Sequence, residues 1–191
     1  MDMVSSAIYR YYPSRDDLLT ALIMDAYNDL GATVEAADRS VAERADLRAR
    51  WLAAGTAVRD WALAKPAEYA LLYGSPVPGY AAPQDTVAAA ARTPAVLAQI
   101  LADGAAAGVL PRAGATASAP LPAGVRADLM AVADVITPGL PAEVLMTGLV
   151  SWMQLFGTVS FELFGQLNNV IEARAEFFEH DLSLMADVMG L

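Results

Sequence analysis

The stretch that decides the fold lies near the start of the chain and reads Val4-Ser5-Ser6-Ala7-Ile8-Tyr9-Arg10-Tyr11-Tyr12-Pro13-Ser14-Arg15-Asp16-Asp17-Leu18-Leu19. Pro13 lacks a backbone N–H and its ring clashes with a preceding helical turn, so it ends a short helix predicted from Ser5 to Tyr12. Ser14 then begins a second helix, because its hydroxyl can accept the backbone N–H of Asp17, a cap that stabilises a helix start by about 1 kcal/mol. A short polar helix held at a sharp angle to a longer one is typical of an element that reads a DNA groove.

The same stretch resembles the end of the helix-turn-helix domain of TetR-type (tetracycline-repressor-like) transcriptional regulators. In that family the recognition helix carries a small-residue pair and then Ala-(Leu/Ile)-Tyr-(Arg/His)-(His/Tyr)-(Phe/Tyr), and the next helix opens with (Pro/Lys)-Ser-(Lys/Arg)-(Asp/Glu)-(Asp/Glu)-Leu. Residues 5–12 and 13–18 match these patterns nearly position for position. The resemblance implies that side chains here reach phosphates or base edges in the major groove, although Tyr9 suits the core equally well. The expected DNA-binding residues are Ser5, Ser6, Tyr9, Arg10 and Tyr11.

The family resemblance also predicts how the chain divides. The recognition helix is the third helix of the family's DNA-binding domain, whereas the matching residues here follow almost directly on Met1. We therefore expect a truncated helix-turn-helix domain over residues 1–37, made of the recognition and connecting helices. A helical ligand-binding and dimerisation domain is expected over residues 38–191. Binding to operator DNA is expected only if the missing N-terminal helices are present, since they hold the recognition helix.

Composition narrows the class of protein. The 191 residues are enough for one ample core, 56% of them are hydrophobic, and no run alternates apolar and polar residues as a strand would, so an all-α fold is predicted. The absence of cysteine excludes a disulfide framework and a thiolate metal site, and fits a cytoplasmic protein. The net charge of −10 is unusual for a DNA-binding protein, whose affinity depends on neutralising phosphates. Most of that acidity lies in residues 61–191, away from the predicted recognition helix.

Apolar spacing, proline and glycine predict the remaining elements. Pro94 is expected to kink or break the fourth helical segment after Thr93. Asn168 or Asn169 is expected to cap the last helix. The predicted helices span residues 14–37, 46–65, 66–73, 85–108, 125–135, 141–167 and 169–189, with loops at 74–83 and 111–124.

The penultimate predicted helix is apolar nearly all round. Such a helix needs two surfaces to bury its faces against, one in its own domain and one in a partner subunit. We therefore expect a homodimer in which the last two helices of each chain form a four-helix interface of more than about 2,000 Å². The expected interface residues are Leu149, Trp152, Phe156, Leu163, Phe177, Phe178 and Met185.

A membrane-spanning alternative exists for the same helix. Residues 144–161 carry no charge and are long enough to cross a bilayer. However, seven Thr, Ser, Gln and Gly residues make the segment only moderately apolar, Glu143 and Glu162 bound it, and no Lys/Arg cluster orients it. Met1 is followed by Asp2 without a basic or apolar leader. We expect a buried helix, no membrane partner and a cytoplasmic protein.

The middle of the chain extends the resemblance. Residues 50–53 and 61–80 look like the regulatory domain of the TetR subgroup named for a Trp-His-Gly motif. Trp152 and Gly157 match that motif, but Phe156 stands where the name implies histidine. The resemblance implies a small apolar effector in a cavity between helices, where aromatic and methionine side chains are suited, although any one of them is more often part of an ordinary core. The expected ligand-binding residues are Trp61, Tyr69, Tyr73, Met130, Met153, Phe156 and Phe161, with Tyr80 and Met146 as further candidates.

Signs of catalysis are lacking in the sequence. The single histidine, His180, lies between Glu179 and Asp181 near the end of the chain, too little for a metal site or a catalytic triad. No phosphate-binding loop or nucleophile elbow occurs, so no catalytic residue, metal or cofactor is expected. The sequence therefore predicts a TetR-type repressor that binds operator DNA as a homodimer and is released by a small effector. The alternative is a ligand-binding or protein-interaction helical bundle that has lost DNA binding.

Overall fold

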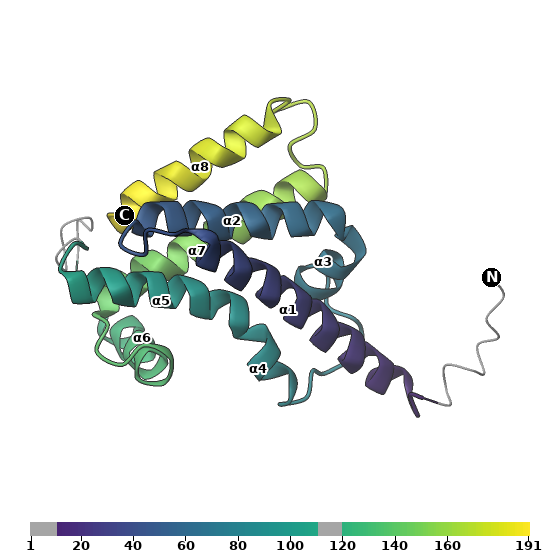
Figure 1. Cartoon of the computed structure of the whole chain (residues 1–191). Coiled ribbons are helices and arrows are strands. Elements are labelled where there is room, and N and C mark those ends of the chain that lie inside the picture. The colour runs from purple at the N-terminus through teal and green to yellow at the C-terminus, as the bar shows by residue number, and fades with distance from the viewer. Residues whose placement is uncertain (1–10, 111–119) are drawn as a thin grey trace.

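The computed structural model describes residues 11–110 and 120–191, and all regular structure in these two ranges is α-helical. The predicted all-α fold is confirmed. Figure 1 shows α2 in the middle of the bundle, with α8 on one side of it and α1 and α5 on the other. The helices are α1 (Arg15–Ser40), α2 (Leu47–Ala64), α3 (Pro66–Tyr73), α4 (Thr86–Ala90), α5 (Arg92–Ala107), α6 (Ala123–Ile136), α7 (Ala142–Leu163) and α8 (Arg174–Met189).

Helix α1 begins as its sequence predicts. The Ser14 hydroxyl accepts the backbone N–H of Asp17 at 3.1 Å and donates to the Asp17 carboxylate at 2.7 Å. The first turns of α1 project beyond the bundle, at the end of the molecule opposite the C-terminus (Figure 1). Further along, Leu30 and Val34 are buried in the core. The predicted recognition helix lies outside the described residues, apart from Tyr11 and Tyr12, which are not helical.

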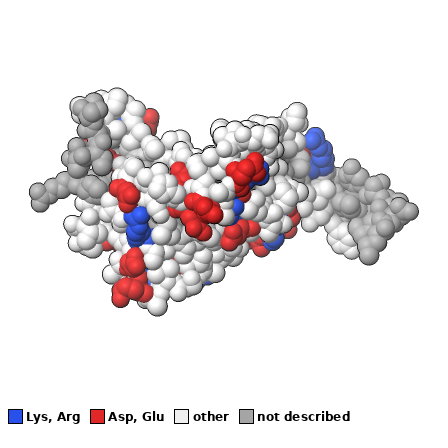
Figure 2. Space-filling view, turned by 90° about the horizontal axis from the view of Figure 1, so that it is seen from above, with Lys and Arg blue, Asp and Glu red and all other residues white. Residues whose placement is uncertain are grey.

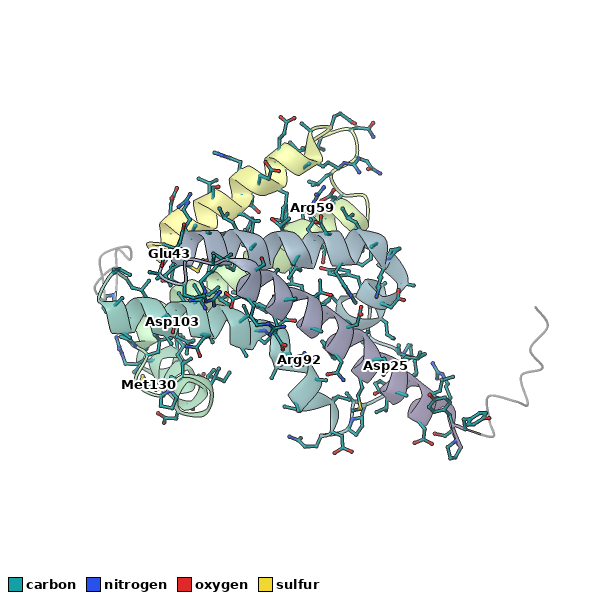
Figure 3. The ribbon with its side chains drawn as sticks, in the orientation of Figure 1. Asp25, Glu43, Arg59, Arg92, Asp103 and Met130 are labelled. Carbon is teal, nitrogen blue, oxygen red and sulfur yellow. The ribbon has the colours of Figure 1, made fainter. Side chains whose placement is uncertain are left out.

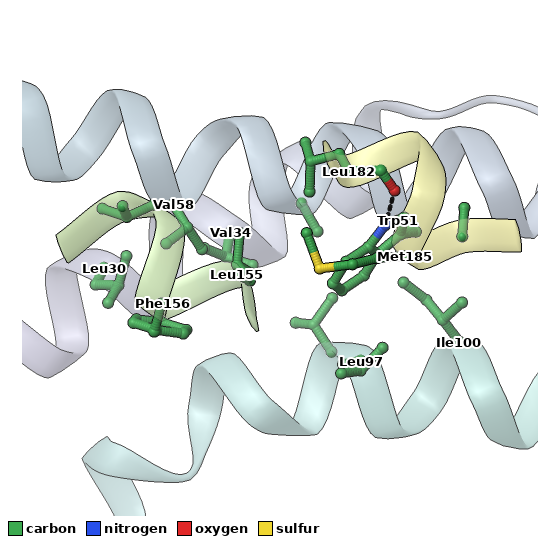
Figure 4. Packing of buried hydrophobic residues seen from close by; sticks show 14 of the residues in the cluster. Leu30, Val34, Trp51, Val58, Leu97, Ile100, Leu155, Phe156, Leu182 and Met185 are labelled. Atoms are coloured by element: carbon green, nitrogen blue, oxygen red, sulfur yellow. Dashed lines mark hydrogen bonds between the residues drawn. The ribbon is translucent and has the colours of Figure 1, made fainter. Parts of the chain in front are cut away.

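The core forms around Trp51 of α2 (Figure 4). Its indole ring is 2% exposed, and its Nε1 donates to the backbone carbonyl oxygen of Leu182 in α8 at 2.9 Å. This bond satisfies the polar atom of a large buried side chain and fixes α8 against α2. Buried side chains of α1, α5 and α7 complete the cluster, among them Leu30, Val34, Ile100, Leu101, Leu155 and Val159.

An ionic cluster around the buried side chains of Arg50 and Asp38 joins the end of α1 to α2 and α5. The Arg50 side chain, 2% exposed, donates to Asp38 at 2.7 Å and to Asp103 at 2.6 Å, and Arg44 donates to Asp38 at 2.6 Å. Burial opposes ionisation of Asp38, but the hydrogen bonds from Arg50 and Arg44 outweigh it and hold the pKa of this carboxyl below its ordinary value. Asp38 pairs with the two arginines and does not end α1. The helix continues to Ser40, three residues beyond the predicted end.

Three further predicted boundaries are wrong. Helix α7 ends at Leu163, four residues before its predicted end, and the starts of α5 and α8 also differ. The chain breaks between α4 and α5 at Ala91, and Pro94 lies within the first turn of α5, where its missing N–H costs no helical hydrogen bond. The last helix begins at Arg174 without a side-chain cap, and not at Asn169, whose φ of 60° lies in the left-handed region. The Arg174 guanidinium donates to the Asn168 side chain at 2.7 Å, so the residues expected to be helical form a fixed turn between α7 and α8.

Candidate functional site

A cavity of about 560 Å³ lies between α1, α3, α4 and the loop of residues 74–85 that joins α3 to α4. It is partly open to solvent, and its volume falls within the range of roughly 300–1,000 Å³ typical of small-molecule sites. No charged residue belongs to its lining, although the chain as a whole carries a net charge of −10. The lining residues are Ile23, Tyr27, Leu71, Leu72, Gly74, Ser75, Pro76, Val77, Tyr80, Ala82, Thr86, Val87, Ala90 and Ala91.

The loop that walls the cavity is held at both ends. Gly74 ends α3 where a side chain could not fit, because an added Cβ would lie 2.3 Å from the carbonyl oxygen of Ala70. The Tyr80 hydroxyl forms a 3.0 Å hydrogen bond with Thr20 of α1, and the Thr86 hydroxyl donates to the carbonyl oxygen of Pro83 at 2.8 Å. These contacts bring the loop against α1 and give the cavity a defined wall.

The polar atoms facing the cavity are uncharged. Burial raises the pKa of Tyr27 above its ordinary value, so its phenol is neutral at physiological pH. Within the described ranges the Tyr27 hydroxyl has no hydrogen-bond partner, whereas the Tyr80 hydroxyl is engaged with Thr20. The site therefore combines an apolar body with two hydroxyls available to a ligand, the half-buried phenol of Tyr27 and the exposed hydroxyl of Ser75.

An aromatic cluster adjoins the cavity and leads from α1 to α7. The ring of Tyr27 meets Tyr73 of α3 edge-on at 6.3 Å, and Tyr73 packs on Phe156 of α7 at 4.4 Å. Phe156 in turn packs on Trp152 at 4.3 Å. The hydroxyl of Tyr69 in α3 donates to the carbonyl oxygen of Phe156 at 3.1 Å. Burial, together with the neighbouring phenols, raises the pKa of Tyr73, which keeps this cluster neutral as well.

The structure brings together only part of the predicted ligand-binding set. Tyr69, Tyr73 and Phe156 share the aromatic cluster, and Tyr80 lines the cavity itself. Trp61 is buried and donates its Nε1 to Asp29.

The methionine and phenylalanine candidates lie elsewhere. Met130 lies on α6, on the far side of the bundle from α3 (Figure 3), and Met153 and Phe161 of α7 are both 55% exposed. Met146 is half-buried on α7. Ile23 and Tyr27 were not among the ligand-binding residues predicted from the sequence. The available signal was their four-residue spacing on α1, which places both side chains on one side of the helix.

Two further hollows lie among the described residues. One of about 10 Å³ lies between α1, α2, α5 and α7, beside Trp51, Trp152 and Leu155. A second hollow of about 380 Å³ lies on the surface between α1 and α4–α5, where Arg92 makes two 2.8 Å bonds to Glu35. In the described ranges no group of three or more His, Asp or Glu side chains could hold a metal ion.

Helices α7 and α8 expose an apolar surface, which we call the C-terminal face. Of the predicted interface residues, Leu149 and Phe177 are exposed, and Trp152 and Leu163 are half-buried. Phe156, Phe178 and Met185 are buried within their own protomer. The exposed large side chains of the C-terminal face are Leu149, Val150, Met153, Phe161, Phe164, Phe177, Leu184 and Val188.

Helix α7 is also long and apolar enough to cross a membrane by length and composition, with a third of its apolar window buried. Length and composition are weak evidence here, because a core helix of a soluble bundle passes the same test. One side of α7 packs on the bundle, and Glu162 near its end makes a buried two-pronged ion pair with Arg59 of α2, at 2.6 and 2.7 Å. Arg59 points from α2 toward this end of α7 (Figure 3).

Comparison with known proteins decides the family. Residues 51–185 match the tetracyclin repressor-like C-terminal domain. The chain belongs to the TetR family. Over 174 residues this TetR-family chain is 40% identical to the HTH-type transcriptional regulators Rv1816 of Mycobacterium tuberculosis and Mb1846 of Mycobacterium bovis. The match covers 87% of the chain and 69% of each relative, so the chain is a TetR-family transcriptional regulator.

Solved structures agree with this assignment. The TetR-family chain superposes on the crystal structure of SCO4313, which bears the name of a regulatory protein, with a TM-score of 0.74 and 32% identity over 99% of this chain and 80% of that one. A protein of unknown function from Rhodococcus sp. RHA1 shares the fold, with a TM-score of 0.64 and 21% identity. Of the DNA-binding residues expected in this regulator, Ser5, Ser6, Tyr9 and Arg10 lie outside the described residues, and Tyr11 is 76% exposed.

Proposed function

We propose that this TetR-family regulator is a cytoplasmic repressor that binds operator DNA as a homodimer and releases it when a small apolar effector binds. The observation that carries the proposal is the C-terminal face, an exposed apolar surface on two adjacent helices. Eight large apolar side chains exposed on α8, on α7 or just after its end favour burial against a second protein surface. The same face of a second copy supplies a self-complementary partner.

The residues that the proposal assigns to DNA are Ser5, Ser6, Tyr9, Arg10 and Tyr11, within a DNA-binding segment of residues 1–37. Most of helix α1 belongs to this segment, and α1 packs against α2, α3, α4 and α5. A change in how α1 sits in the bundle would therefore move the DNA-binding segment. In a dimer, two recognition helices must lie about 34–36 Å apart to enter successive major grooves, so their separation is the quantity that an effector controls.

Effector control needs only a modest difference in affinity. A ligand that binds one arrangement of the dimer better than the other shifts the population by its differential affinity, and about 1–3 kcal/mol is typical of regulation. The cavity beside α1 and the aromatic cluster that leads from it to α7 support this proposal, since they link α1 to the helix that carries the C-terminal face.

The alternative is a helical bundle that binds ligands or proteins and no longer contacts DNA. The net charge of −10 favours it, and Figure 2 shows acidic side chains outnumbering basic ones on the face that it draws. Such a surface repels phosphates, so DNA affinity must come from the N-terminal segment alone.

A salt titration distinguishes the two proposals. The protein as its gene encodes it is mixed with a duplex selected from a random-sequence library, and binding is followed by fluorescence anisotropy. A repressor that makes 6–10 phosphate contacts is expected to lose roughly 10³–10⁵ in affinity between about 50 and 200 mM salt.

A matched pair of variants localises the contact. Arg10→Ala should weaken binding and flatten the salt dependence, whereas Arg39→Ala, at the far end of α1, should leave both unchanged. DNA binding that does not change with salt, or a library from which the protein selects no duplex, would favour the alternative.

A further inference from the structure

The cavity between α1, α3, α4 and the 74–85 loop suggests which ligand this regulator takes and where. We propose that it is the effector site, and that it accepts an uncharged aromatic molecule bearing one hydrogen-bonding group. This inference rests on the proposed effector-controlled function, and it names the site and the chemistry of the effector. The small hollow beside Trp51 offers only about 10 Å³, whereas this cavity offers about 560 Å³.

The lining disfavours ions. None of its residues is charged, and burial raises the pKa of Tyr27, which keeps this phenol neutral at physiological pH. In this partly open cavity a charged ligand would lose part of its hydration and gain no opposite charge in return, which costs more than the transfer of a neutral group. Neutral molecules are therefore selected over anions and cations of the same shape.

The shape and composition of the walls favour a ring. The cavity is lined by the rings of Tyr27 and Tyr80 and by Pro76, with Ile23 and Leu72 among the aliphatic residues. Aromatic side chains contribute large contact areas and prefer offset or edge-on contacts with another ring. Aliphatic side chains cover the rest of such a ligand without demanding hydrogen bonds.

The Tyr27 hydroxyl supplies the polar contact. It has no hydrogen-bond partner among the described residues, and it belongs to a side chain whose ring is half-buried in the wall. A phenol can both donate and accept, so it pairs with a hydroxyl or a carbonyl group of a ligand. Because the ring of Tyr27 also contacts Tyr73, a ligand on Tyr27 acts at the start of the aromatic cluster that reaches α7.

The test measures binding of naphthol to the whole chain by isothermal titration calorimetry in the absence of DNA. Naphthoate, which has the same two rings and a negative charge, serves as the matched probe. Naphthol is expected to bind saturably at one site per chain, and naphthoate at least about tenfold more weakly. Absence of saturable naphthol binding, or equal binding of the two probes, would overturn the proposal.

Two substitutions in α4 locate the site. Ala90 lines the cavity and Ala88 lies on the other side of the helix, against the shallow hollow. Ala90→Phe should weaken naphthol binding by at least about tenfold, whereas Ala88→Phe should leave it unchanged. Equal binding by both variants would place naphthol elsewhere and reject the site.

Tyr27→Phe tests the polar contact with a smaller change. Loss of one hydrogen bond should lower the affinity for naphthol by roughly threefold to tenfold, while the thermal unfolding temperature stays that of the wild type. An affinity for naphthol equal to that of the wild type would show that the Tyr27 hydroxyl does not contact the ligand. Since no DNA is present, a negative result here rejects the effector site alone, and the salt titration of DNA binding tests the repressor function separately.

Discussion

At the scale of single residues, the pairing of Asp38 with Arg50 shows how charge is placed inside this bundle. Both side chains are buried, and the acid accepts hydrogen bonds from two arginines. A buried pair is not a large net source of stability, but removing one partner leaves the other without compensation. The cluster therefore fixes the C-terminal end of α1 against α2 and α5, and α1 runs from there toward the start of the DNA-binding segment.

The lowered pKa of Asp38 gives a pH prediction. The unfolded chain takes up a proton near the ordinary value of 3.8, whereas the folded chain resists it. The stabilisation from ionised Asp38 is thus complete above pH 3.8. It is lost as the pH falls through the lower pKa that Asp38 has in the folded state. Asp38→Asn should cost about 1–3 kcal/mol near neutral pH, and the difference from wild type should shrink in acid.

Urea unfolding at a series of pH values measures this effect, with Asp25→Asn on the exposed side of α1 as the control. The control should change the free energy of unfolding by less than about 0.5 kcal/mol. A difference between Asp38→Asn and wild type that stays constant down to the acid limit would refute the role given to this carboxylate.

At the scale of the helix, close approach between α5 and α7 defines the core side of α7. A Cβ added at Gly148 would lie 2.3 Å from Cδ1 of Leu101, a side chain that is 1% exposed. The glycine therefore serves packing and not flexibility. One side of α7 fits its own bundle at this point, which leaves the C-terminal face to meet another surface.

Gly148→Ala should accordingly destabilise the protein by about 1–3 kcal/mol, although alanine is the better helix former, because the added methyl overpacks the core. Gly124→Ala in α6 is the control, since nothing lies within 4 Å of its added Cβ, and it should be neutral or slightly stabilising. Chemical denaturation of both variants measures the contrast. If Gly148→Ala were also stabilising, the close packing of α7 on α5 would be disproved.

The helices show what sequence can and cannot predict. The Ser14 cap, the Pro66 start of α3 and the turn-rich loop after it depend on neighbouring residues, and all three were predicted. The start of α8 was not, because the hydrogen bond from Arg174 to Asn168 and the left-handed Asn169 are set by how the chain turns back on α7.

The candidate site was harder to predict than the helices. Its walls come from α1, α3 and α4, which are separated along the chain by up to about seventy residues, so their meeting depends on tertiary packing. The aromatic residues that looked most suitable for a ligand, Tyr69 and Phe156, are instead in contact with one another. The family resemblance, in contrast, rests on short patterns that need no tertiary information, and the comparisons confirm it.

At the scale of the whole molecule, the account depends on association of two chains through the C-terminal face. Met153 and Phe161 lie two helical turns apart on the exposed side of α7, where a partner helix would cover both. Met153→Asp combined with Phe161→Asp should dissociate the dimer without unfolding the protomer, because neither side chain is in the core. Val109→Asp replaces an exposed apolar residue outside this face and should leave association unchanged.

Sedimentation equilibrium of the wild-type chain, over a wide range of protein concentration, tests this central claim most directly. The account predicts a mass of twice the 20.1 kDa chain, reduced to that of one chain in the Met153→Asp, Phe161→Asp variant. A wild-type protein that sediments as a single 20.1 kDa chain at every concentration would contradict it.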